Sequence, residues 1–366
     1  MAGDRATIAD VARAASVAPS TASVVFSGRA GVSEATRRRV LEAAARLGYA
    51  GPDPRAASLR RGRSGIVGVV FEERLGAAFL DPVKTLMMDG LAEAVAPMDA
   101  GLLLLRDEPG AVQDQPGAEP GAEPTTAGAL SLQSAPVDAV VLVGCSGRLA
   151  ESLEVMRARG IPVVVIEGDA GEGIPRIELD NREAQRQAAS HVRGLGHTDV
   201  VLLTLPFRAE DSRGWVTDDE VPVIEVTRHR LEGAREIYPQ APVYRATASL
   251  IDEGVAAGRA ILAATDARVR PTAVIAQSDL LAAGVVRAAE ELGIDVPGQL
   301  SVTGFDGVAV DGFAPRRLTT LVQPAAQKGR AAGEAVARML ANEPAASIRF
   351  TCDFRDGDTT GPVPRR

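Results

Sequence analysis

The segment from Val17 to Gly28, VAPSTASVVFSG, offers hydroxyl and apolar side chains and contains no Arg, Lys, Asn or Gln. Hydroxyls can bond to several DNA bases and apolar groups can contact the thymine methyl, whereas bidentate base contacts need longer polar side chains. Three arginines follow at 37–39, and arginine binds phosphate oxygens without reading sequence. The pattern favours a DNA interface over a small helical bundle with a solvated basic face.

Asp279 follows the apolar run TAVIA, which is typical of a buried strand. Ligands of open α/β sheets bind beyond the carboxyl ends of strands, so this carboxylate is a candidate acceptor for ligand hydroxyls or amines. The same position also fits a helix N-cap, and the two roles are compatible. Asp180-Asn181 before a predicted helix is better explained as a cap, and Asp306 in GFDG as a structural residue.

Motifs of catalysis are missing from the sequence. GLG at 194–196 lacks the third glycine of a dinucleotide fingerprint, and GxxxxGK[ST], HExxH and GxSxG do not occur. The three histidines have no metal-ligand spacing with one another or with Cys145 and Cys352, which we expect to be buried thiols. We therefore expect no enzyme activity, no cofactor and no metal site.

Charge is distributed unevenly along the 366 residues. Residues 1–64 contain 11 Arg and 5 acidic residues, whereas the rest carries a net charge of −14. A basic head on an acidic body indicates a phosphate-binding module joined to one that does not seek phosphate. The cysteine usage, the short apolar runs and the lack of an apolar leader segment predict a cytoplasmic protein without membrane association.

Three short helices are expected in the head. Ile8, Val11, Ala12 and Ala15 share one face of the first helix, which Thr7 caps. Pro19 suits the first position of the second helix, in which Ala22, Val25 and Phe26 face inward. Ser33 caps the third helix, Gly48 ends it, and its inward face holds Val40, Ala44 and Leu47.

The body alternates short apolar runs with segments of helical length, such as 181–196 and 279–293. This alternation indicates parallel sheets covered by helices on both faces, and the number of runs suggests two sheets. The length agrees with more than one domain.

The head resembles the DNA-binding head of lactose-repressor-type (LacI/GalR family) transcription regulators. The resemblance rests on TIADVARAASVAPSTASVV, VSEATRRRVLEAAARLGY and AASLRRGRS, which occur in the family's order. It implies base or groove contacts by the second helix and by an intercalating hinge leucine, at Pro19, Ser20, Val24 and Leu59. It implies phosphate contacts at Thr7, Ser23, Ser33 and Thr36.

Two features depart from the family pattern. The usual Ser-Arg of the second helix is Ser23-Val24, which removes the commonest guanine-reading side chain. The connection from Tyr49 to Leu59 is one residue longer than usual, and Ala57 replaces the usual hinge arginine. We therefore expect more of the operator specificity to come from DNA shape at the hinge.

The stretch RPTAVIAQSDLLAAGVVRAAEELGIDVPGQLSVTGFDG resembles the body of the same family. The resemblance implies two lobes like those of periplasmic sugar-binding proteins, three crossovers and an effector in the cleft. It implies effector contacts by Asp279, by Arg230 of an Arg-x-x-Gly motif, and by an aromatic at Phe79. Arg230 also fits a surface helix, and the usual proline before Phe79 is missing.

Two further segments depart from the family. Residues 109–128 include a GAEP repeat and almost no large apolar residue, so we expect a disordered insertion. Residues 208–226 are longer than usual, and their Trp215 suits either a cleft aromatic or a loop anchor.

The predicted fold is an all-α helix-turn-helix head (1–51), a hinge helix (52–64) and a two-lobed α/β body (65–366). The predicted function is a homodimeric transcription repressor that binds a pseudo-palindromic DNA operator, switched by a small effector in the cleft. A carbohydrate is the family's usual effector; few aromatics are available for stacking, so a nucleobase-like or phosphorylated ligand stays open. The alternative is a sugar-binding protein of the periplasmic type without a regulatory role.

Overall fold

The fold was analysed in a computed structural model. It describes residues 6–27, 30–51, 62–71, 75–106, 134–144, 149–168, 171–208, 211–217, 219–263 and 270–365. The chain divides into two compact units, Met1–Gly65 and Ile66–Arg366, which we call the head and the body. The hinge leucine Leu59, Cys145 and the predicted insertion 109–128 lie outside the described residues.

The head contains the three predicted helices, α1 (Ile8–Ala14), α2 (Pro19–Phe26) and α3 (Glu34–Leu47). Thr7 and Asp10 form a complete capping box at α1, and Pro19 occupies the first turn of α2. Gly48 ends α3 in the left-handed conformation, at φ +64°. These features confirm the three helices and the boundaries predicted for α3.

The core of the head is small and made mostly of alanine and valine. Val11, Ala22 and Val40 are completely buried, one on each helix, and Phe26 packs edge-on against Tyr49. Leu47 was predicted to face this core, and that prediction is wrong. It lies at the last turn of α3 with 41% of its surface exposed.

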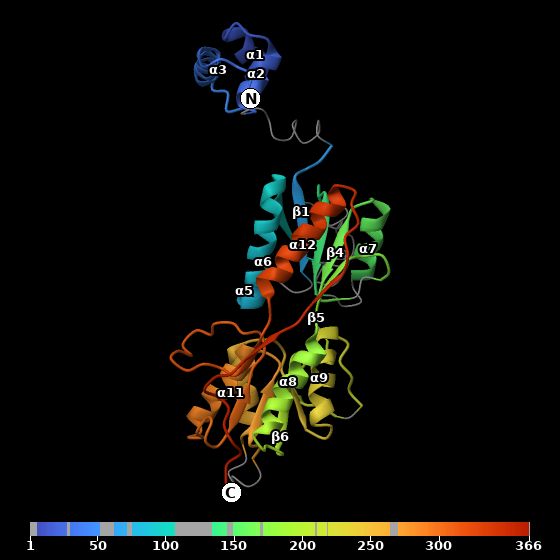
Figure 1. The fold of residues 1–366 in the computed structure, drawn as a ribbon, viewed down its shortest axis with the longest axis vertical. Helices are drawn as coiled ribbons and strands as arrows, with labels where there is room; N and C mark the ends of the chain where they lie inside the picture. The colour runs from blue at the N-terminus through green and yellow to red at the C-terminus, as the bar shows by residue number, and fades with distance from the viewer. Residues whose placement is uncertain are drawn as a thin grey trace, which may run out of the picture. The chain divides into compact units, whose positions relative to one another are not determined.

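The N-terminal lobe of the body is built on a six-stranded parallel sheet of order β12-β5-β4-β3-β1-β2. Its strands are β1 (Ile66–Phe71), β2 (Gly101–Arg106), β3 (Ala139–Val143), β4 (Val163–Ile166), β5 (Arg176–Leu179) and β12 (Ile348–Phe350). The helices α6 (Pro82–Val95) and α12 (Ala325–Leu340) cover one face, and α7 (Leu149–Ala158) covers the other (Figure 1). The short helices α5 (Leu75–Leu80) and η1 (Ala96–Met98) flank α6.

The C-terminal lobe has a second sheet of order β10-β9-β6-β8-β7, parallel except at the edge strand β7. Its strands are β6 (Val200–Thr204), β7 (Gly214–Trp215), β8 (Val243–Arg245), β9 (Ala273–Ala276) and β10 (Ser301–Thr303). One face is covered by α8 (Asn181–Gly194) and α9 (Glu225–Ile237), the other by α10 (Ile251–Ile261) and α11 (Asp279–Glu291). Two covered parallel sheets confirm the predicted α/β body.

The chain passes between the lobes three times, as the family resemblance implies. The crossovers run from β5 into α8, from β11 (Thr320–Val322) into α12, and from β12 into β13 (Asp353–Arg355). β11 and β13 pair antiparallel with each other. The crossovers bring the ends of β4, β10 and β11 and the start of α8 to one place, the junction of the lobes.

Glycines allow the paired helices of the body to approach closely. A Cβ on Gly329 of α12 would lie 1.9 Å from the carbonyl oxygen of Met87 in α6, and one on Gly90 would lie 2.0 Å from that of Ala326. The pair α10 and α11 has the same feature at Gly254 and Gly284. These contacts fix the helices that carry Lys328 and Asp279 against the sheets.

Candidate functional sites

The second helix presents its predicted base-reading residues to solvent. Pro19, Ser20 and Ser23 are exposed and Val24 is half-buried, while Ala22 and Val25 on the opposite face are buried in the head. The N-terminus of α2 has no side-chain cap. This helix therefore offers hydroxyls, apolar groups and free backbone N–H groups on one surface, and no bidentate hydrogen-bonding side chain.

Three of the four predicted phosphate-contacting residues lie at helix N-termini. Thr7 accepts from the Asp10 amide, and the Ser33 hydroxyl accepts from the amide of Thr36 and donates to its hydroxyl. Capping of this kind contributes about 1 kcal/mol. A helix N-terminus with a hydroxyl is suited to bind a phosphate oxygen, so capping and phosphate binding can share these side chains.

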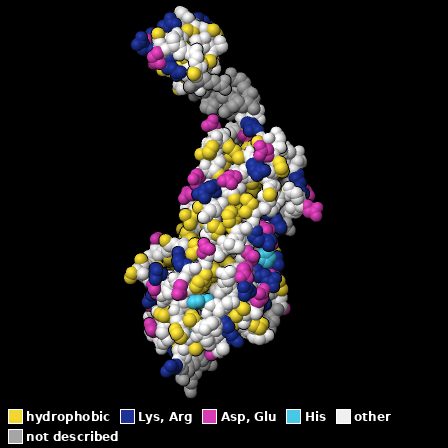
Figure 2. Space-filling model, viewed as in Figure 1, with side chains coloured by type: hydrophobic (Ala, Val, Ile, Leu, Met, Phe, Trp, Pro, Cys, Tyr) yellow, Lys and Arg dark blue, Asp and Glu magenta, His cyan; other side chains and the backbone are white. Residues whose placement is uncertain are grey.

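Basic residues surround these caps. Arg38 and Arg39 are exposed on α3, whereas Arg37 donates to the carbonyl oxygen of Val25 at 3.4 Å and so ties α3 to α2. Figure 2 shows dark-blue Arg side chains on the surface of the head. This arrangement satisfies the electrostatic requirement of a DNA interface.

In the body, Arg230 of α9 is 97% buried and contacts several protein groups. Its Nε donates to Asn181 Oδ1 at 2.8 Å and its Nη1 donates to the Gln277 carbonyl oxygen at 2.6 Å. Its guanidinium carbon lies 3.6 Å from the centre of the Phe305 ring, and Nη1 lies 3.7 Å from Asp306. Arg230 is thus not the surface arginine that the sequence left open.

A second buried cation, Lys328 of α12, lies in the N-terminal lobe at the same junction. It is completely buried and donates to Glu167 Oε2 at 2.8 Å and to Gln323 Oε1. Burial favours a raised pKa for Glu167, but the charges of Lys328 and Arg230 outweigh it and hold that pKa below the usual value. We call the linked side chains at the junction the polar ring: Glu167, Asn181, Arg230, Asp306, Gln323 and Lys328.

Asp279, predicted to bind effector, is the first residue of α11 and is completely buried. Its carboxylate accepts from the Thr320 hydroxyl at 2.5 Å and from the Val308 amide at 2.9 Å. Burial raises the pKa of Asp279 to about 6 against the effect of these hydrogen bonds. Burial, with repulsion from Asp279 and Asp81, also raises the pKa of Asp306, although Arg230 opposes it.

Ser278, and not Asp279, caps α11, through a hydrogen bond from the Leu281 amide. The Asp279 carboxylate instead joins three segments of the C-terminal lobe, and Gly304 makes room for it, because a Cβ there would lie 2.2 Å from Oδ1.

Asp180 caps α8, as predicted for Asp180-Asn181, by accepting from the Glu183 amide. Asn181 is instead the first residue of α8 and, like Asp306, belongs to the polar ring.

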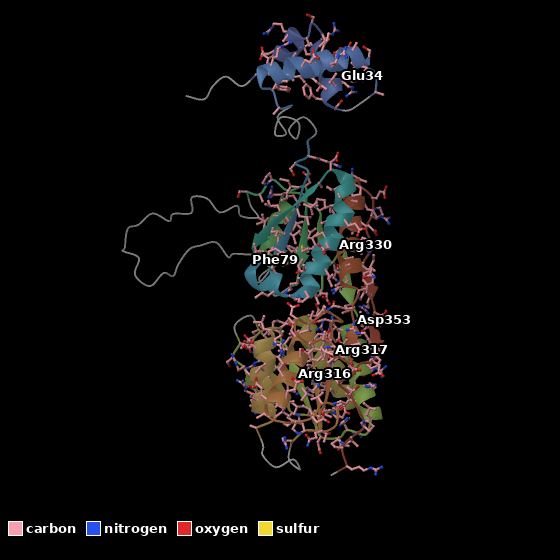
Figure 3. The ribbon with its side chains drawn as sticks, turned by 90° about the vertical axis from the view of Figure 1, so that its left-hand side faces the viewer. Glu34, Phe79, Arg316, Arg317, Arg330 and Asp353 are labelled. Carbon is pink, nitrogen blue, oxygen red and sulfur yellow. The ribbon has the colours of Figure 1, made fainter. Side chains whose placement is uncertain are left out.

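Phe79, the third predicted effector contact, lies on α5 with 52% of its surface exposed. Figure 3 shows it on the side of the N-terminal lobe near the C-terminal lobe. Arg230 and Asp279 both lie close to Asp306, whereas no interaction joins Phe79 to them in the described part of the chain.

A cavity of about 360 Å³ opens at the junction, between the first turn of α9 and the residues that follow β4 and β5. Its lining holds five acidic residues and three arginines and no Phe, Tyr or Trp. Figure 2 shows dark-blue and magenta side chains together beside the junction. Glu167 and Asn181 are the ring members that line this cavity, while Arg230 and Lys328 lie beneath them.

Sequence reasoning missed Glu167, Lys328 and Gln323. Glu167 was detectable in principle, since it directly follows the apolar run PVVVI, and Asp279 was found by the same signal three positions after TAVIA. Lys328 gives no such signal, because a lysine in an alanine-rich helix is usually exposed.

Trp215 does not line the junction cavity. It belongs to the edge strand β7, packs edge-on against Tyr244 at 5.2 Å between ring centres, and is half exposed. It borders a separate groove of about 600 Å³ near the starts of β6 and β8. Trp215 is therefore an anchor of the segment 208–226.

Cys352 is buried as predicted, and burial raises its pKa to about 12. Among the described residues, no cluster of His, Cys, Asp and Glu could hold a metal ion. Within the same residues, no helix has the length and apolarity needed to cross a bilayer.

Two family profiles match the chain. Residues 7–51 match the bacterial regulatory proteins of the lacI family, and residues 189–360 match the periplasmic binding protein-like domain. The first match covers α1 to α3, and the second covers most of the C-terminal lobe and the last crossovers.

Whole-chain comparisons agree with these matches. An HTH-type transcriptional regulator of Mycolicibacterium smegmatis is 33% identical, with 98% of this chain and 97% of the relative aligned. A lacI-family regulator from Corynebacterium glutamicum has a similar structure, with a TM-score of 0.65 at 26% identity, over 97% and 99% of the two chains.

The lac repressor dimer bound to operator and an anti-inducer superposes with a TM-score of 0.72 over 98% and 100% of the two chains. At 19% identity this similarity shows the fold. Three observations therefore lead to the same conclusion: the helix-turn-helix head, the two-lobed periplasmic-binding-protein-like body and the relative that aligns from end to end. The chain belongs to the lacI family of bacterial transcription regulators.

Proposed function

We propose that this regulator is a cytoplasmic repressor that binds a pseudo-palindromic operator as a homodimer and acts without catalysis. The observation that carries the proposal is the exposed surface of α2, flanked by the capped N-termini of α1 and α3. One head reaches few base pairs, so two heads related by symmetry are needed for a specific site. The head also argues against the alternative of a periplasmic sugar carrier.

For the DNA interface we propose the residues predicted from the sequence. Pro19, Ser20 and Val24 contact bases, and Leu59 enters the minor groove. Phosphate contacts come from Thr7, Ser23, Ser33 and Thr36.

The effector that we propose is an uncharged, polyhydroxylated molecule such as a carbohydrate. Its site is the junction cavity, whose lining has side chains that can hydrogen-bond to hydroxyls. Five acidic residues against three arginines disfavour a phosphorylated ligand. Arg230, Asp279 and Phe79, which the family resemblance implies as effector contacts, are not part of this lining. Arg230 supports the site indirectly, through its hydrogen bond to Asn181.

Two measurements on the full-length protein test the proposal. Selection of operators from a random DNA pool should yield an inverted repeat, and sedimentation of the complex should give a mass of two chains per duplex. A thermal-shift screen should find a neutral polyol that raises Tm and changes affinity for the selected operator. A direct repeat or no enrichment refutes the DNA part; a hit that the protein chemically converts refutes the non-enzymatic part.

A further inference from the structure

The polar ring joins two ion pairs, one from each lobe, and only the Glu167 side chain among them is partly exposed, at 16%. Lys328 and Glu167 both belong to the N-terminal lobe and are 2.8 Å apart. Arg230 and Asp306 belong to the C-terminal lobe and are 3.7 Å apart. Breaking one buried ion pair is strongly destabilising, because it leaves a charge without a partner in the interior.

Two amide side chains connect these ion pairs. Asn181 accepts from Arg230 through Oδ1 and donates from Nδ2 to Glu167 at 3.1 Å. Gln323 donates from Nε2 to Asp306 at 2.6 Å and accepts from Lys328 through Oε1. Each amide therefore links the cation of one ion pair to the anion of the other.

An amide can make both bonds at these two positions, whereas a charged side chain cannot. A carboxylate accepts but does not donate, and an ammonium donates but does not accept. An acid at position 181 would face the carboxylate of Glu167, and an acid at position 323 would face that of Asp306. The hydrogen bonds of the ring therefore run in a fixed direction, which we call its polarity: each amide accepts from a cation and donates to an anion. This direction depends on the amide groups of Asn181 and Gln323.

The backbone at both ring carboxylates is strained. Glu167 has φ +54° and Asp306 has φ +120°, a region that residues other than glycine rarely adopt. Such conformations persist where the surrounding structure stabilises them, and they are common at functional sites. The hydrogen bonds and ion pairs of the ring supply this stabilisation at both residues.

We propose that the polar ring is a polarity-matched lock that holds the two lobes in this arrangement. The bond between Asn181 and Glu167 joins α8 to the residue that follows β4, so it closes the ring directly from lobe to lobe. It borders the cavity, and a cavity ligand meets the lock at these two residues. That consequence rests on the proposed function, whereas the lock itself does not.

The test is made in the full-length protein. One substitution turns an amide of the ring into an acid, and a second turns the facing acid into an amide. Asn181→Asp should lower the Tm of the body by roughly 5–10 °C, because two carboxylates then oppose each other. It should also speed hydrogen exchange at the crossovers 179–181 and 322–325. Adding Glu167→Gln removes the repulsion and supplies an amide that can donate to the new carboxylate, but it also takes the anion from Lys328. The double variant should therefore lose less stability than the sum of the two single variants.

The same test can be repeated independently at the second amide, Gln323. Gln323→Glu should act in the same direction and should be compensated by Asp306→Asn. Gln240→Glu, an exposed change in the turn before β8, controls for the added charge and should leave Tm and exchange unaltered.

Double variants whose loss of stability equals the sum of the two single losses, at both amides, would overturn the lock. If Asn181→Asp alone does not fold, a folded double variant is itself the compensation, and an unfolded one counts against it. The test uses neither DNA nor ligand. Failure of an effector screen would therefore refute the proposed function and leave the lock standing.

Discussion

The guanidinium of Arg230 lies 3.6 Å from the centre of the Phe305 ring, in the C-terminal lobe. Phe305 is completely buried and follows β10, so its ring supports Arg230 from one side while Asn181 and Gln277 accept hydrogen bonds at the edge. Planar stacking combined with fixed donors is a role that suits arginine and not lysine.

We therefore expect Arg230→Lys to lower the free energy of unfolding of the body by about 3 kcal/mol. The variant keeps the charge but loses the stacking and one of the donors. Urea denaturation followed by circular dichroism measures the effect. Arg182→Lys is the control, because Arg182 pairs with Glu236 at the surface with 57% of its side chain exposed, and it should have a much smaller effect. Equal effects would contradict a supporting role for Arg230.

The second prediction concerns base reading by α2. Val24→Arg places a bidentate donor on the exposed helix and should sharpen or shift operator preference at one base pair, by about 1–3 kcal/mol of discrimination. Selected operators sequenced for the wild type and the variant measure the change. A uniform gain in affinity across all sequences would indicate a phosphate contact instead.

The third prediction concerns the hinge. Leu59→Ala should weaken binding to the selected operator far more than Ser20→Ala, because intercalation and bending then provide most of the specificity. Fluorescence anisotropy at fixed salt, with selected and random duplexes, gives the specificity ratio. If Leu59→Ala binds normally, or the central step of the operator varies freely, the hinge account is wrong.

The fourth prediction concerns the contact of α6 with α12. Gly329→Ala should lower Tm strongly or prevent folding, since its Cβ would lie 1.9 Å from the carbonyl oxygen of Met87. Gly194→Ala in α8 is the matched control: its Cβ would meet nothing within 4 Å, and alanine is a better helix former. Equal Tm values for the two variants would refute close packing at Gly329.

The fifth prediction is a pH dependence that arises from Asp279. Its pKa of about 6 in the folded protein exceeds 3.8, the ordinary value for an aspartate. Folding therefore favours the protonated form, and the contribution of Asp279 to stability is present below about pH 4 and lost as pH rises through about 6.

Asp279→Asn should thus destabilise the protein most at pH 4 and less at pH 7. The free energy of unfolding of both proteins, measured from pH 4 to 7, tests this difference. Glu167→Gln should have the opposite trend, because the pKa of Glu167 is lowered and its contribution is lost as pH falls. A cost of Asp279→Asn that grows toward pH 7 would show that the folded protein favours the ionised carboxylate.

The sequence by itself determined the helices of the head, the two covered sheets of the body and the family. These features depend on local signals: the capping box at Thr7, Pro19 in the first turn of α2, Gly48 after α3, and the alternation of apolar runs with helical segments. Each signal acts over a few residues, so the order of residues along the chain is enough to detect it.

Only the tertiary structure decided the surroundings of the charged residues at the junction. Arg230 and Asn181 are 49 positions apart, and Lys328 and Glu167 are 161 apart, so no spacing in the sequence could pair them. Whether a lysine in a helix is solvated or buried depends on what the rest of the chain packs against it, and here three crossovers bring the partners together. For the same reason, Arg230 and Asp279 could be identified from a motif while their partners could not.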